Sequence, residues 1–199
     1  MKRHTLVEYA DASPPVRAIY DDVLATIGAP VSGLPNWIKA IGNNANVLKA
    51  AWEKYKNVVF AGDVPLLLKQ LILFVISMKA GNRYCSASHG HMALSLDKTL
   101  SCDDLYSLAR GQAFPTLPPA FQAAISLVTQ AAAYPAGIED DGFDFEDELR
   151  AVGFSELEID ELMAQADLGV MMNTLTSIWH IKPEVELPPP TRTPDSAPA

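Results

Sequence analysis

An all-α fold is predicted by three features of the 199-residue sequence. Apolar residues recur at helical spacing in several segments, capping residues precede those segments, and no stretch is convincing as a strand. With 49% hydrophobic and 20% charged residues, the composition is typical of a folded chain that buries one core. We therefore expect one helical domain at residues 13–181, after an N-terminal arm at 1–12 and before a Pro-rich tail at 182–199.

Three helices are expected in the first third of the chain. The first follows the cap Ser13, the second is short and covers about 36–41, and the third follows the cap Asn44. In the third helix, Trp52 and Tyr55 are three positions apart and form one aromatic ridge. We interpret this ridge mainly as core, with the Tyr55 hydroxyl as a candidate pocket group.

The middle of the sequence predicts a central antiparallel pair of helices at about 63–80 and 83–97. The first of these is apolar nearly all round, which is typical of a buried helix, and Asp63 is its expected cap. After a glycine turn, Asn82 is expected to cap the second helix by accepting from the backbone N–H of Cys85.

Further helices are expected towards the C-terminus. Ser101 caps a short one, an Ala-rich one covers about 120–134, and the acidic segment 139–148 leads into another. The capping box at Ser155 opens a long helix that runs to about His180. From position 182 onward, six prolines in eighteen residues predict an extended tail that lies on a neighbour or remains disordered.

Cys85 and His89 are the candidate reactive pair. A thiol in a first helical turn faces unpaired backbone N–H groups and the positive end of the helix dipole, which favour the thiolate. Four residues along a helix place sulfur and imidazole on one face, where His89 can share the thiol proton. The alternative is that Cys85 is a small buried hydrophobe and His89 a hydrogen-bonded core histidine.

The octet from Asn82 to His89, NRYCSASH, resembles the Cys-x-x-Cys-x-x-x-His motif of the AhpD-like alkylhydroperoxidase and carboxymuconolactone decarboxylase family, in its peroxidase-related branch. The likeness covers most of residues 14–180. It implies an AhpD-like helical domain, an antioxidant oxidoreductase activity and a homo-oligomer, either a dimer, a trimer or a hexamer.

The resemblance also assigns roles to residues. Cys85 falls on the family's second Cys and His89 on its His, whereas Asn82 replaces the first Cys and Gln70 occupies the position of the Glu. Asn cannot resolve a sulfenic acid and Gln cannot accept a proton, so the internal redox cycle is lost. The expected catalytic residues are Cys85 and His89. The supporting positions are Asn82, Gln70, Tyr84 and Arg83, and the possible pocket walls are Trp37 and Tyr55.

Three functions follow as hypotheses. In the first, Cys85 attacks a small-molecule hydroperoxide, His89 manages the protons and an external thiol acts as the reductant. In the second, Asn82 and Gln70 mark a redox-inactive oligomeric protein that binds or scaffolds. The third is a carboxymuconolactone-decarboxylase-like enzyme with His89 as acid–base group and Arg83 as a carboxylate anchor, which ranks last because its substrates require more positive charge.

Composition excludes several other classes. A net charge of −9 and a pI near 4.8 argue against nucleic-acid binding. The N-terminus lacks a signal-peptide pattern and the longest apolar run is too short for a membrane span, so a cytoplasmic protein without membrane contact is expected. No motif for a cofactor or metal is recognised, and Cys85 and Cys102 are too few for a disulfide framework.

Overall fold

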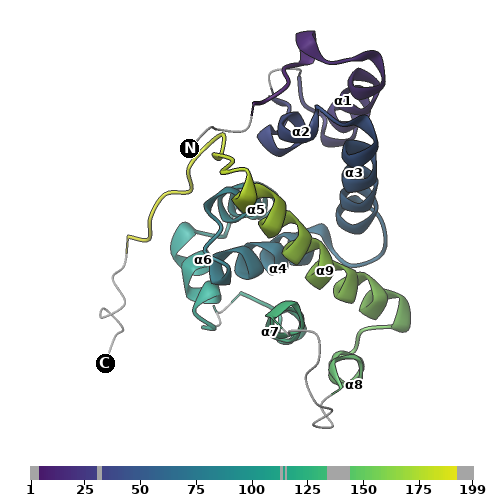
Figure 1. The fold of residues 1–199 in the computed structure, drawn as a ribbon. Helices are drawn as coiled ribbons and strands as arrows, with labels where there is room; N and C mark the ends of the chain where they lie inside the picture. The colour runs from purple at the N-terminus through teal and green to yellow at the C-terminus, as the bar shows by residue number, and fades with distance from the viewer. Residues whose placement is uncertain (1–4, 31–32, 113, 115, 134–143, 192–199) are drawn as a thin grey trace.

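The computed structural model describes residues 5–30, 33–112, 114, 116–133 and 144–191 (Figure 1). The described residues form α-helices and one 3-10 helix, with no strand, which confirms the all-α prediction. The elements are η1 (Tyr9–Asp11), α1 (Pro14–Ile27), α2 (Asn36–Ile41), α3 (Ala45–Phe60), α4 (Leu66–Lys79), α5 (Arg83–Leu96), α6 (Cys102–Ala109), α7 (Pro119–Ala133), α8 (Phe145–Ala151) and α9 (Glu156–Ile178).

The helices form two hydrophobic cores on either side of the central pair. Helices α1, α2 and α3 gather at one end of the molecule and α7 and α8 at the other, with the long α9 running between them (Figure 1). One core contains α1 to α3 with the start of α5 and part of α9, and the other contains α4 with α6 to α9. Leu73 of α4 and Cys85 of α5 belong to the first core, so the central pair joins the two.

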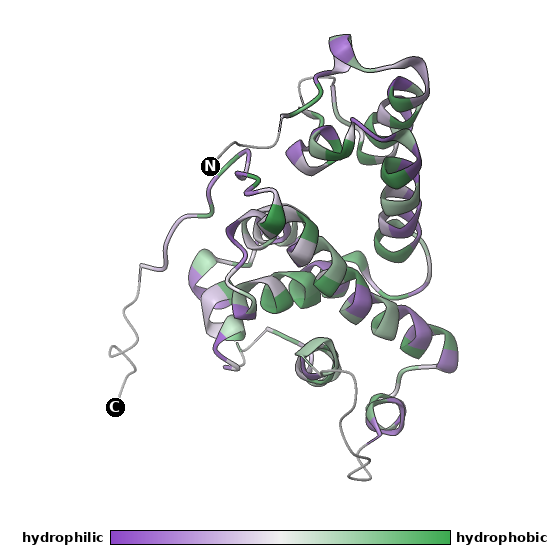
Figure 2. Cartoon of the chain, in the orientation of Figure 1, coloured by the Kyte–Doolittle hydropathy of each residue, from purple (hydrophilic) through white to green (hydrophobic). Residues whose placement is uncertain are grey.

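Helix α4 is the buried centre of the fold, as its sequence predicts. Every residue from Leu68 to Ser77 is buried, and the helix is mostly hydrophobic in Figure 2. The buried Lys69 forms an ion pair with Glu161 of α9, with 2.8 Å between nitrogen and oxygen. A buried charge is tolerated only when it is paired in this way, so the pair fixes α4 against α9.

The start of α4 corrects one sequence prediction. Asp63 was expected to cap this helix, but α4 begins only after Pro65, which stands at the cap position without a side-chain hydrogen bond. The backbone N–H groups of Asp63 and Val64 instead donate to the carboxylate of Glu161, at 2.7 and 3.1 Å. A partner from α9, about a hundred residues away, replaces the local cap.

The turn between α4 and α5 follows the prediction. Gly81 has φ = 66°, in the left-handed region that glycine tolerates best. Asn82 then caps α5, because its side-chain oxygen accepts the backbone N–H of Cys85 at 2.8 Å. Cys85 therefore lies in the first turn of α5.

Two of the later helices begin at the predicted capping residues. Ser101 and Ser155 each form a full capping box, at the starts of α6 and α9. Asp144 caps α8, while residues 139–143 of the acidic segment lie outside the described residues. Helix α9 ends at Ile178, two residues before the predicted end, and His180 follows with a left-handed φ of 50°.

After α9, residues 182–191 follow an extended path at the edge of the molecule (Figure 1). They contact α2 through Asn36, α5 through Arg83 and His91, and α6 through Asp103. None of the described helices combines the length and the apolar character that crossing a bilayer requires.

Candidate functional site

A cavity of 440 Å³ lies between α1, α2, α3 and α5, and contains both Cys85 and His89 in its lining. Helix α9 contributes Met172, and Glu184 comes from the segment after α9. The volume falls within the range of ordinary small-molecule pockets, about 300 to 1,000 Å³. The sulfur thus borders a space that a small substrate can occupy.

Aromatic rings form one wall of the cavity. The ring centroid of Trp37 lies 6.5 Å from that of Trp52 and 5.3 Å from that of Tyr55, and Trp52 and Tyr55 stack at 6.0 Å. The indole N–H of Trp52 donates to Asp22 at 2.6 Å, which fixes that ring from behind. The ridge that the sequence placed mainly in the core is therefore also a pocket wall.

Cys85 is buried, with 2% of its surface exposed. Its sulfur lies 3.4 Å from the hydroxyl of Thr176 on α9. Burial raises the pKa of Cys85 to about 11, although hydrogen bonding with Thr176 and Ser77 opposes the rise. Desolvation therefore opposes the thiolate that the position at the start of α5 favours, and holds Cys85 as the neutral thiol near pH 7.

His89 is also buried, and its ring stacks on Tyr55 with centroids 6.5 Å apart. Its Nδ1 lies 2.8 Å from the side-chain oxygen of Gln70. Because that amide oxygen only accepts, Nδ1 carries the proton and Nε2 is the basic nitrogen. Burial lowers the pKa of His89 to about 4, so the imidazole is neutral near pH 7.

The two reactive side chains have separate partners. Cys85 pairs with Thr176 and His89 pairs with Gln70, and no hydrogen bond between described residues joins the thiol directly to the imidazole. A proton can therefore pass between them only through a bound substrate or water. The resting site holds a neutral thiol and a neutral base on one face of α5, as the four-residue spacing predicted.

Asn82 has a structural role that a cysteine would not fill. It is 5% exposed, caps α5, and does not line the cavity. Its amide nitrogen lies within hydrogen-bond distance of the Asn173 carbonyl at 3.0 Å, the Thr176 hydroxyl at 2.7 Å and the Ser177 hydroxyl at 2.9 Å. Asn82 thereby ties the start of α5 to the end of α9.

The two remaining supporting residues, Tyr84 and Arg83, differ in their position relative to the cavity. Tyr84 lines the cavity, where its hydroxyl accepts the backbone N–H of Trp37 at 3.3 Å and donates to Glu184 at 2.9 Å. Burial raises the pKa of Tyr84 well above its usual value, so the phenol stays protonated. The side chain of Arg83 is 80% exposed and pairs with Glu186 at 3.0 Å, outside the cavity.

Glu184 is the main residue that sequence reasoning missed. It lies in the Pro-rich stretch, where no local pattern distinguishes it from its neighbours, and only the path of the chain brings it to the cavity. Among the described lining residues it is the one acidic or basic side chain besides the neutral His89. Thr176, which contacts the sulfur, was likewise not predicted, because the sequence shows it only as one polar residue of a long helix.

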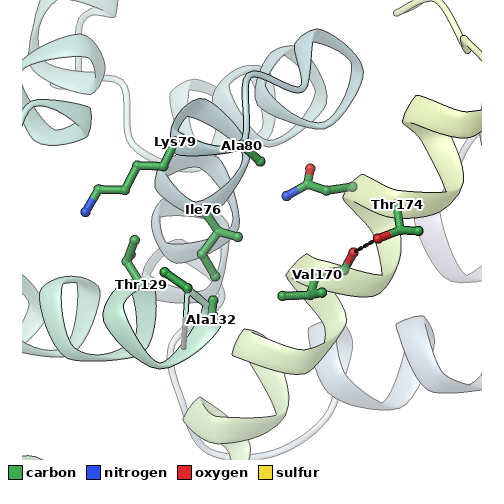
Figure 3. Close-up of a pocket in the computed structure, with 9 residues that line it drawn as sticks. Ile76, Lys79, Ala80, Thr129, Ala132, Val170 and Thr174 are labelled. Atoms are coloured by element: carbon green, nitrogen blue, oxygen red, sulfur yellow. Dashed lines mark hydrogen bonds between the residues drawn. The ribbon is translucent and has the colours of Figure 1, made fainter. Parts of the chain in front are cut away.

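A second cavity of 290 Å³ lies between α4, α7 and α9 (Figure 3). Ile76, Thr129 and Val170 line it, and no Cys or His is among its described lining residues. The hydroxyl of Thr129 and both amide atoms of Asn173 are buried there without a hydrogen-bond partner in the described part of the chain. It offers hydrogen-bonding groups and the amine of Lys79, but neither a thiol nor an imidazole among its described lining residues.

No metal cluster is found in the described ranges, where no three His, Cys, Asp or Glu side chains are grouped as ligands. No protein-family model matches the sequence, and no curated protein matches it. Solved structures do match, over most of their length.

An uncharacterized peroxidase-related protein of Ralstonia eutropha JMP134, described as an alkylhydroperoxidase AhpD core, aligns with a TM-score of 0.75 at 16% identity, covering 92% of both chains. A peroxidase-related protein of Silicibacter sp. TM1040 aligns with a TM-score of 0.68 at 18% identity over 92% of both chains. The debrominase Bmp8, as a cysteine-to-alanine variant in complex with 2,3,4-tribromopyrrole, aligns with a TM-score of 0.73 at 21% identity, again over 92% of both chains.

Proposed function

We propose that this chain is a thiol-dependent oxidoreductase in which Cys85 reduces a small organic hydroperoxide. The proposal starts from the AhpD-like fold that the chain shares with peroxidase-related proteins. The observation that supports this proposal is the shared cavity of Cys85 and His89. Its aromatic wall favours an apolar organic substrate over hydrogen peroxide.

The proposed reaction begins with proton transfer. Because the resting thiol is neutral, its proton passes to Nε2 of His89 through the bound hydroperoxide or a water. The sulfur then attacks the terminal peroxide oxygen, which carries a hydrogen, and the O–O bond breaks. Cys85 becomes a sulfenic acid, and the departing alkoxide takes the proton from His89 and leaves as an alcohol.

An external thiol completes the cycle. The sulfenic acid condenses with one thiol to give a mixed disulfide and water, and a second thiol then releases Cys85 with formation of an external disulfide. Asn82 at the position of the family's first Cys provides no internal substitute.

The test is turnover of cumene hydroperoxide with an external dithiol, followed by mass spectrometry of the oxidised sulfur. Wild type is expected to turn over with a sulfenic acid at Cys85, and Cys85→Ser is expected to be inactive. Cys102→Ser is the matched control and is expected to keep wild-type turnover, because Cys102 is not among the lining residues. An unmodified Cys85 in folded protein at millimolar hydroperoxide would refute the proposal.

A second candidate function is a ligand-binding protein that has lost redox chemistry. The raised pKa of Cys85, the lowered pKa of His89 and the structural contacts of Asn82 favour it. Native turnover that depends on Cys85 excludes this candidate, and ligand binding without turnover supports it. No observation favours the decarboxylase reading, since Arg83 lies outside the cavity and Glu184 repels substrate carboxylates.

A further inference from the structure

The segment 182–191 completes the wall of the cavity. Its course is set at several points: the carbonyl of Lys182 accepts from the side chain of Asn36 at 3.1 Å, and Thr191 donates through its backbone N–H to Asp103 at 2.7 Å. Between these points Leu187 packs against Gly90, where an added Cβ would come within 2.9 Å of the leucine side chain. The position of Glu184 is thereby determined on both sides.

The carboxylate of Glu184 has one oxygen held and one oxygen free. Oε1 accepts the backbone N–H of Asn36 at 2.5 Å and the hydroxyl of Tyr84 at 2.9 Å. No described residue donates a hydrogen bond to Oε2. A carboxylate fixed through one oxygen presents the other as an oriented acceptor, with little conformational entropy left to lose on binding.

We propose that the cavity binds a planar aromatic or heteroaromatic molecule with a ring N–H or phenolic O–H, and that Oε2 of Glu184 accepts the hydrogen bond from that group. The clustered rings of Trp37, Trp52 and Tyr55 give the cavity an apolar aromatic wall against which such a plane packs. An anionic acceptor at the cavity selects donors and disfavours anions. The inference rests on the proposed function, because it specifies that the organic hydroperoxide substrate carries such an aromatic ring.

The test compares indole with 1-methylindole, which lacks the N–H but is otherwise larger and more apolar. Binding is measured by ligand-observed NMR titration of the Cys85→Ser protein, so that no chemistry interferes. We expect indole to bind about threefold to tenfold more tightly than 1-methylindole, the range for one charge-assisted hydrogen bond to an exposed side chain.

Two single-residue variants in segment 182–191 test whether Glu184 is responsible for the preference for indole. Glu184→Gln keeps the acceptor for Asn36 and Tyr84 but removes the charge, and is expected to abolish most of the preference for indole. Glu186→Gln is the matched control, because Glu186 is two residues away and pairs with Arg83 outside the cavity, and it is expected to keep the preference.

If the Cys85→Ser protein binds indole and 1-methylindole equally tightly, the inference is overturned, whether or not the Glu184 and Glu186 variants fold. An equal loss of the preference for indole in Glu184→Gln and Glu186→Gln also overturns the inference. The hydroperoxide assay separates this result from the proposed function: oxidation of Cys85 without indole preference refutes only the ligand class, whereas indole preference without oxidation refutes the redox chemistry and leaves a binding site.

Discussion

At the scale of single residues, the surroundings of Cys85 and His89 oppose charge on both side chains. The first turn of α5 brings helix N–H groups to the sulfur, as the sequence predicts, yet burial moves its pKa upward. His89 keeps only an amide partner in Gln70, and an amide brings no negative charge to stabilise an imidazolium. Reactivity must therefore arise by proton transfer within the occupied cavity.

The raised pKa predicts a steep pH dependence for Cys85. Below a pKa of about 11, the thiolate fraction grows with pH. The rate of alkylation by iodoacetamide is therefore expected to rise about tenfold per pH unit between about pH 7 and 9. Mass spectrometry of a Cys102→Ser background measures the rate at Cys85 alone, and a plateau below pH 8 would show that the thiol is more acidic than its burial indicates.

The replacement Gln70→Glu is expected to raise the pKa of His89. The amide oxygen is 2.8 Å from Nδ1, so a carboxylate there stabilises the imidazolium. An NMR titration of the His89 imidazole is expected to show a rise of about one to three pH units from its lowered value. Gln130→Glu, on the exposed face of α7, adds the same charge elsewhere and is expected to leave this titration unchanged. An unchanged pKa in Gln70→Glu would mean that the new carboxyl is protonated.

At the scale of elements, the junction between α5 and α9 explains why position 82 holds an asparagine. Its oxygen caps α5 and its nitrogen reaches three acceptors on α9. The cap was predictable because it involves residues three positions apart. The contacts with α9 were not, because they join residues more than ninety positions apart.

Asn82→Ala is expected to destabilise the protein by about 2 to 3 kcal/mol, since it loses a helix cap and the buried amide donor that reaches three acceptors on α9. Asn44→Ala is the matched control, because Asn44 caps α3 through Asn46 and Val47 at an exposed position. Its expected cost is about 1 kcal/mol. Urea unfolding measures both, and equal losses would show that the contacts with α9 contribute nothing.

At the scale of the whole molecule, the path of the chain after α9 decides what the cavity contains. The tail was expected to lie on a neighbour or to be disordered, but its described part covers α2, α5 and α6 of its own chain. That path brings Glu184 to the cavity. Helix α9 itself carries large exposed apolar side chains, Leu157 at 68% and Ile178 at 64%. Each side chain is exposed singly at one end of α9, and each is a candidate for the contact in the predicted homo-oligomer.

A homo-oligomer stays a prediction that one measurement tests. Light scattering coupled to size-exclusion chromatography is expected to give two, three or six times the chain mass of 21.5 kDa. A concentration-independent mass of one chain would contradict it. Ile178→Lys and Leu157→Lys, measured in parallel, show which end of α9 contributes to the contact, since a buried lysine weakens an interface.

The sequence alone determined the helices, most of their caps, the central pair and the common face of Cys85 and His89. Each of these depends on residues within about one turn of one another, where spacing and capping chemistry suffice. The tertiary structure alone decided that the thiol and imidazole are neutral, that the aromatic ridge is a pocket wall, and that Glu184 completes the cavity. Desolvation and long-range contacts depend on which distant segments pack around a group, and no local pattern encodes that arrangement.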